Sequence, residues 1–124
     1  GARLDFHVAL YVVWTGGGLY APPPPALYAI REHIAANTKR LRAIVESPVF
    51  RKGVGVIEGE KLQRVPRGFP KDHAAAEFLK FKQFFAGREL PISVATGSRF
   101  YPAMLSVFRR IIPLVRFLNE PLAR

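Results

Sequence analysis

The side chains best suited to chemistry in this 124-residue chain are basic, and they lie within one short stretch. Lys61, Arg64 and His73 flank the sequence Pro66-Arg67-Gly68, in which proline and glycine predict a tight turn. Arginine presents a planar fork of N–H donors to phosphate or carboxylate, and glycine lets backbone N–H groups approach a ligand. We therefore predict an anion-binding site formed by Lys61, Arg64, Arg67, Gly68 and His73.

A purely structural interpretation of the same stretch stays open. Arg67 could bond a carbonyl or a carboxylate, and Gly68 could be required only by the turn. Asp72 is a suitable N-cap for the alanine-rich run 74–80, so a helix is expected to begin beside His73. In the binding interpretation, the partial positive charge at the N-terminus of that helix adds to the attraction for an anion.

The sequence gives little indication of a nucleotide, metal or catalytic site. Gly16-Gly17-Gly18 is not followed by the Lys-Ser or Lys-Thr of a P-loop and is not part of a Gly-x-Gly-x-x-Gly run, so we expect a turn or bulge there and no cofactor. The chain has no cysteine, and His7, His33 and His73 fall on different predicted elements, so we expect no metal site. No side chain is assigned as catalytic.

The elements that must position the basic stretch begin with a predicted strand over residues 4–14, whose even positions are all apolar. After the prolines at 22–25, a helix beginning near Pro24 or Pro25 is expected to bury Leu27, Ile30 and Ile34. A second helix is expected after an N-cap at Asn37 or Thr38, and Ser47-Pro48 predicts the start of a third.

The second half of the chain predicts a short hairpin over residues 54–65, the helix at 74–80 and a strand after Gln83. A long helix capped by Ser98 should follow, bent or split by Pro113. The expected fold class is α+β, with a small antiparallel sheet packed against several helices and a long C-terminal helix bent near Pro113. We expect residues 1–124 to form a single domain or the C-terminal part of one.

Several blocks of residues resemble an uncharacterised bacterial family catalogued as domain of unknown function 2461. The resemblance rests on the strand followed by Gly-Gly-Gly-Leu-Tyr, on Ile30-Arg31, on Lys61-Leu62 with Pro66-Arg67-Gly68-Phe69 and Asp72-His73, on Leu79-Lys80 with Lys82 and Phe84, and on Phe108-Arg109 with Pro113-Leu114 and Phe117-Leu118. It implies a fold and a bacterial origin, but no activity. Because proteins of this family are longer, we expect the chain to be a C-terminal portion that packs against an upstream segment.

The charge of the chain suggests what it binds. Nineteen Lys and Arg against nine Asp and Glu give a formal net charge of +10, which attracts nucleic acid or acidic metabolites. The favoured function is a non-catalytic basic module that binds an anionic small molecule or nucleic acid. The alternative is part of an enzyme acting on a phosphorylated or carboxylated small molecule, with its catalytic residues upstream. Because no apolar stretch is long enough to span a bilayer, we expect no membrane partner, and the absence of cysteine fits a cytoplasmic protein.

Overall fold

A three-stranded antiparallel sheet forms one layer of the computed structural model, which describes residues 3–8, 12–19, 22–95 and 97–122. Its strands are β1 (Arg3–Val8), β2 (Val12–Leu19) and β3 (Phe84–Pro91), in the order β1-β2-β3. The single strand predicted over residues 4–14 is therefore wrong, because its two ends belong to β1 and β2, which pair with each other. The connection at 9–11 lies outside the described residues.

The three glycines do not form the turn or bulge that we predicted. Gly16, Gly17 and Gly18 lie inside β2, where each pairs with a residue of β1 and a residue of β3. Gly18 has a φ of +146°, and a Cβ atom built there would overlap the carbonyl oxygen of Phe84. Glycine is required at this position because the backbones of β2 and β3 approach too closely for a side chain.

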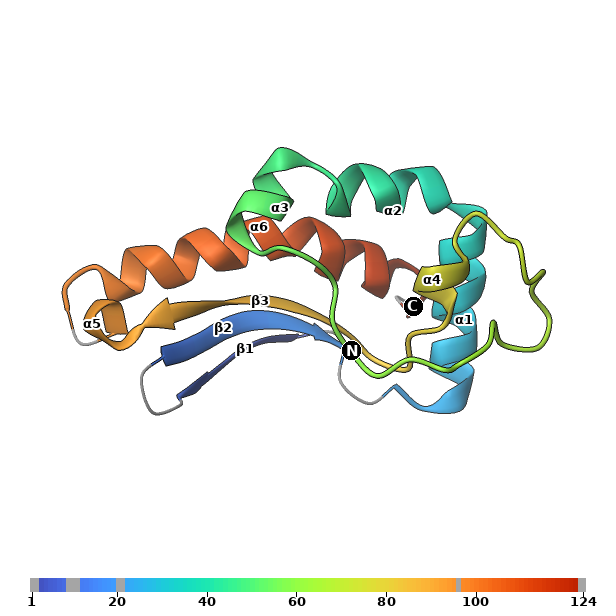
Figure 1. Cartoon of the computed structure of the whole chain (residues 1–124), viewed down its shortest axis with the longest axis horizontal. Coiled ribbons are helices and arrows are strands. Elements are labelled where there is room, and N and C mark those ends of the chain that lie inside the picture. The colour runs from blue at the N-terminus through green and yellow to red at the C-terminus, as the bar shows by residue number, and fades with distance from the viewer. Residues whose placement is uncertain (1–2, 9–11, 20–21, 96, 123–124) are drawn as a thin grey trace.

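The long C-terminal helix α6 (Phe100–Asn119) lies along one face of the sheet and packs on β2 and β3 (Figure 1). Its buried residues recur at helical spacing on the face turned inward: Val107, Ile111, Leu114, Phe117 and Leu118. The helix continues through Pro113 as one element, so Pro113 does not split it, and the bend stays a prediction. The short helix α5 (Ile92–Ala95) follows β3 directly.

Two further helices cover α6 on the side away from the sheet. They are α2 (Thr38–Val45) and α3 (Pro48–Gly53), and both contact α6 (Figure 1). Sheet, α6 and the α2–α3 pair thus form three layers, with the hydrophobic core between them. The predicted α+β fold, with a small antiparallel sheet against several helices, is confirmed.

A third group of helices gathers at one end of the sheet. There α1 (Pro24–Ala36) contacts α4 (Ala76–Leu79) and the 3₁₀ turn η1 (Glu120–Leu122). As predicted, α1 begins at Pro24 and buries Ile30 and Ile34, while Leu27 is partly buried. Arg31 joins α1 to the residues before β3, because its Nη2 donates to the carbonyl oxygen of Phe81 at 3.0 Å. Burial lowers the pKa of its guanidinium.

Helix starts follow the sequence only in part. Ser47 caps α3 as predicted, since its hydroxyl oxygen accepts the N–H of Phe50 at 3.2 Å. Asn37 occupies the N-cap position of α2, but its side chain makes no capping bond. Ser98 does not cap α6, which begins at Phe100 after Arg99.

The predicted hairpin over residues 54–65 is wrong. Residues 58–62 run antiparallel to residues 80–85, so the segment pairs with the residues before β3 and with the start of β3 itself. Four backbone hydrogen bonds join the two: Glu58 N–H to the Phe85 carbonyl at 2.6 Å, Phe85 N–H to Glu58 at 3.0 Å, Lys82 N–H to Glu60 at 2.8 Å and Leu62 N–H to Lys80 at 2.8 Å. The basic stretch is thereby fixed beside α4 and the start of β3. None of the helices among the described residues has the length and apolar character needed to cross a membrane.

Candidate functional site

The Pro66-Arg67-Gly68 sequence forms the tight turn that we predicted. The N–H of Phe69 donates to the carbonyl oxygen of Pro66 at 3.3 Å, and Gly68 has a φ of +98°. A positive φ at the third residue is typical of a type II turn and explains the glycine without any ligand. Val65 and Phe69 on either side pack against the core, and the Phe69 ring lies 6.1 Å from that of Tyr28. The turn is therefore anchored on both sides.

Beside this turn lies a basic hollow of about 480 Å³, lined by Arg64, Val65, Lys71 and Lys80. Arg64 and Lys71 come from the loop, whereas Lys80 follows α4. The hydrogen bond from the N–H of Leu62 to the Lys80 carbonyl brings these two parts of the chain together. Three cations from two segments thus surround one hollow.

The loop cations Arg64, Arg67 and Lys71 have no ion-pair partner among the described residues. Arg64, Arg67 and Lys71 are exposed, and none of them forms an ion pair or a hydrogen bond with another described residue. Lys80 differs, since its Nζ lies 2.8 Å from a carboxylate oxygen of Glu77. The hollow therefore keeps a net positive charge. Arg67 lies at the tip of the neighbouring turn and does not line the hollow.

Lys61 is separated from the other predicted site residues. It lines a second cavity of about 190 Å³, between the α2–α3 corner and α4, which we call the apolar pocket. The side chains lining it are mainly apolar and come from four segments: Val45, Val56, Ile57, Phe78 and Phe81, with Glu46, Arg51, Lys61 and Glu77 supplying charges. The Nζ of Lys61 lies 4.7 Å from the centre of the Phe81 ring, a cation–π contact.

His73 has a structural partner. Its Nδ1 accepts the backbone N–H of Ala75 at 2.9 Å, a bond that resembles a helix cap. The predicted helix at 74–80 is shorter than expected: α4 begins at Ala76, and Asp72 does not cap it. With only one turn, α4 has too few aligned peptide groups to attract an anion to its N-terminus. The predicted Asp72 cap and the helix start at residue 74 are therefore wrong.

Glu77 links the two cavities. Its carboxylate lies 2.8 Å from the Nζ of Lys80 in the basic hollow and 3.6 Å from the Nζ of Lys61 in the apolar pocket. The hydrogen bond with Lys80, the charge of Lys80 and, to a smaller extent, Lys61 hold the pKa of Glu77 below its ordinary value. A ligand that binds Lys80 or Lys61 would compete with this carboxylate.

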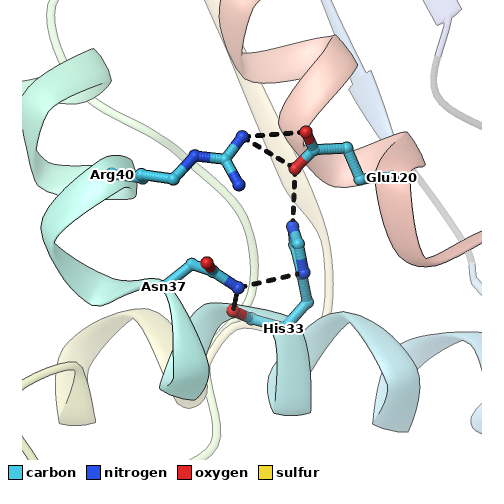
Figure 2. A network of polar contacts seen from close by, with 4 residues as sticks. All are labelled: His33, Asn37, Arg40 and Glu120. Carbon is cyan, nitrogen blue, oxygen red and sulfur yellow. Dashed lines mark hydrogen bonds and ion pairs between the residues drawn. The ribbon is translucent and has the colours of Figure 1, made fainter.

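A separate polar network joins α1, α2 and η1 (Figure 2). Glu120 accepts two hydrogen bonds from Arg40 Nη2, at 2.8 and 2.9 Å, and lies 2.8 Å from His33 Nε2. The amide nitrogen of Asn37 lies 2.9 Å from the His33 carbonyl and 3.2 Å from His33 Nδ1. Because an amide N–H only donates, His33 Nδ1 must accept, which leaves the Nε2 proton for Glu120.

This network is satisfied from within the chain. The His33 ring is tilted by 41° against the Phe117 ring, with centroids 4.6 Å apart, and Arg40 lies over the Phe117 ring at 5.4 Å. The contacts of His33, Arg40 and Glu120 therefore hold the C-terminal end of α6 against α1 and α2. Elsewhere too, the described residues include no cluster of three or more His, Cys, Asp or Glu side chains that could hold a metal ion.

Two residues of the basic hollow, Lys71 and Lys80, were not among those predicted. Lys71 lies three residues after Gly68, so its charge was visible next to the turn in the sequence. Lys80 could not be found in this way, because its position depends on the pairing of residues 58–62 with 80–85. Of the five predicted residues, only Arg64 lines the hollow.

The fold and these cavities define a small α+β protein with a cationic hollow beside an anchored turn. Residues 3–117 match the model of the family described as conserved hypothetical protein (DUF2461). The chain belongs to this family. Neither the search of curated proteins nor the search of solved structures returned a match.

Proposed function

We propose that the chain is a binding module for an anionic ligand, which is held in the basic hollow by Arg64, Lys71 and Lys80. What supports this proposal best is that Arg64 and Lys71 face one hollow without an ion pair among the described residues. Like charges gathered around a hollow repel one another, and an anion between them relieves that repulsion. Phosphate and carboxylate groups both fit such a set of donors.

The kind of side chain favours binding over chemistry. The hollow is lined by three cations and Val65, and arginine and lysine hold their protons near pH 7. Such groups position and neutralise an anion, and nucleic acid phosphates are one source of it. The volume of about 480 Å³ falls within the range of small-molecule sites, roughly 300 to 1,000 Å³. Arg67, at the tip of the adjacent turn, can reach the parts of a larger ligand that project from the hollow.

The test compares two double variants that remove the same charge. Arg64→Ala with Lys71→Ala empties the hollow of its unpaired cations, whereas Lys52→Ala with Arg99→Ala removes one lysine and one arginine exposed on α3 and before α6. The probes are inorganic tripolyphosphate, followed by calorimetry, and a fluorescent single-stranded oligonucleotide, followed by anisotropy.

The first variant should bind at least one probe about tenfold more weakly than wild type, while the second changes affinity less than about threefold. Equal losses in both variants would show that net charge, and not the hollow, is responsible. Unchanged binding in the first variant, or no binding of either probe by wild type, would refute the proposal.

A further inference from the structure

We infer that the apolar pocket is a second binding site, specific for a small monocarboxylate with an apolar body. The site is distinct from the basic hollow in its lining and in the ligand it favours. Its apolar side chains include the buried residues Val45, Ile57 and Phe81. A cavity of about 190 Å³ holds roughly six water-sized groups, which limits the ligand to a short chain or a single ring.

The sign of the ligand's charge follows from how the charged side chains of the pocket are already paired. Each carboxylate is held more closely by a cation that does not line the pocket. Glu77 lies 2.8 Å from Lys80, and Glu46 lies 3.3 Å from Arg42. The carboxylates that line the pocket, Glu77 and Glu46, are therefore neutralised by cations that lie outside the pocket.

The two cations of the pocket are held loosely by comparison. The nearest carboxylate oxygen is 3.6 Å from Lys61 Nζ and 3.9 Å from Arg51 Nη2, and both distances are too long for good hydrogen bonds. The Arg51 side chain is 62% exposed, and Lys61 lies over the Phe81 ring. The free donor capacity at the pocket thus belongs to Lys61 and Arg51, which favours a ligand carboxylate over an ammonium group.

The apolar lining sets the second requirement. A carboxylate alone would leave Val56 and the half-buried Phe78 in contact with water, whereas an apolar tail removes that surface from water at about 25 cal/mol per Å². Affinity for the ligand should therefore need both the charge and the tail. This combination distinguishes the pocket from the basic hollow, which has one apolar side chain among three cations.

Hexanoate is a suitable probe, with acetate, hexanamide and hexylammonium as matched controls for tail and charge. Calorimetry should detect hexanoate binding in the roughly millimolar range or tighter, with the three controls at least about tenfold weaker. Comparable binding of hexanamide or hexylammonium would contradict the charge assignment. Comparable binding of acetate would contradict the role of the tail, and no binding of hexanoate would overturn the inference.

Val56 allows the site to be tested without disturbing the core, because it lines the pocket and is 67% exposed. Val56→Glu should weaken hexanoate binding about tenfold by repulsion, and Val56→Lys should leave it unchanged or strengthen it. Arg51→Gln with Lys61→Gln should weaken it at least as much as Val56→Glu. If both Val56 variants have the same effect, the charge of the ligand does not decide binding at this pocket, and the inference fails.

The outcome is separable from that of the proposed function. Arg64→Ala with Lys71→Ala should leave hexanoate affinity within about twofold of wild type, since neither residue lines the apolar pocket. If this double variant abolishes hexanoate binding, the carboxylate lies in the basic hollow and the second site does not exist. Loss of tripolyphosphate binding with intact hexanoate binding would support both sites independently.

Discussion

Single glycines decide how closely the strands approach. At Gly18 two demands coincide, a φ of +146° and a backbone so near Phe84 that a Cβ atom would overlap its carbonyl oxygen. Gly55 also has a positive φ, of +106°, but no atom of the described residues lies within 4 Å of a Cβ atom placed there. The two positions therefore separate the cost of backbone strain from the cost of a steric clash.

Gly18→Ala should lower the free energy of unfolding by about 3 kcal/mol or more, because strain and clash both act there. Gly55→Ala should cost about 1 kcal/mol, because only the strain applies. Urea denaturation followed by circular dichroism measures both. If the two variants were destabilised equally, the close approach of β2 and β3 at Gly18 would be wrong.

Glu120 is the other residue whose environment makes a clear prediction. The hydrogen bonds from Arg40 and His33 hold the pKa of its carboxyl below the ordinary value of 4.5. A carboxyl whose pKa is lower in the folded state stabilises the protein above the unfolded-state pKa, and this contribution is lost as pH falls through the folded-state pKa.

Glu120→Gln should therefore lower the melting temperature near pH 7, and the difference from wild type should shrink as pH falls below 4.5. The effect near pH 7 should be smaller than that of Gly18→Ala, because the Glu120 side chain is 41% exposed. Glu32→Gln, on the exposed face of α1, is the control and should show no such trend. A melting difference that grows in acid would contradict the network.

Among the elements, the short helix α4 carries a side chain that contacts a lysine of each cavity. Glu77 on α4 is the carboxylate partner of Lys80 in one cavity and of Lys61 in the other. Its negative charge reduces the positive potential in both. Removing that charge should affect anions bound in either place.

Glu77→Gln should strengthen the binding of tripolyphosphate and of hexanoate, each by roughly two- to fivefold, because Lys80 and Lys61 lose a competing carboxylate. Glu89→Gln, an exposed change on β3, removes the same charge elsewhere and should alter neither affinity by as much. Calorimetric titrations of both variants supply the measurement. Weaker binding in Glu77→Gln would mean that Glu77 positions the lysines and does not compete for them.

Elements with local signals were predictable from the sequence. Proline at the first positions of α1 and the Ser47-Pro48 start of α3 act within one turn, so their effect does not depend on the rest of the fold. The prediction of a hairpin at 54–65 was wrong because residues 58–62 pair with residues 80–85 instead. That pairing depends on the path of the whole loop, which no local signal gives. The single strand at 4–14 failed because alternation gives a side-chain face but not the point where the chain turns back.

Over the whole molecule, the five predicted site residues do not share one cavity. The positive charge and the tight turn were visible in the sequence, and Arg64 is the predicted residue that lines the basic hollow. Lys61, only three residues earlier, faces a different cavity, and His73 is occupied by the Ala75 N–H. Sequence distance could not separate these residues, because only the folded path of the loop decides which cations share a hollow.

The salt dependence of oligonucleotide binding decides whether Arg64 and Lys71 hold an anion in the basic hollow. For a single-stranded oligonucleotide, each phosphate contact contributes about 0.7 to the slope of log affinity against log salt concentration. Wild type should bind with a steep slope, and Arg64→Ala with Lys71→Ala should flatten it by about 1.4, the share of two contacts. Lys52→Ala with Arg99→Ala should keep the wild-type slope. Equal slopes for wild type and the Arg64 and Lys71 variant would contradict an anion site in the basic hollow.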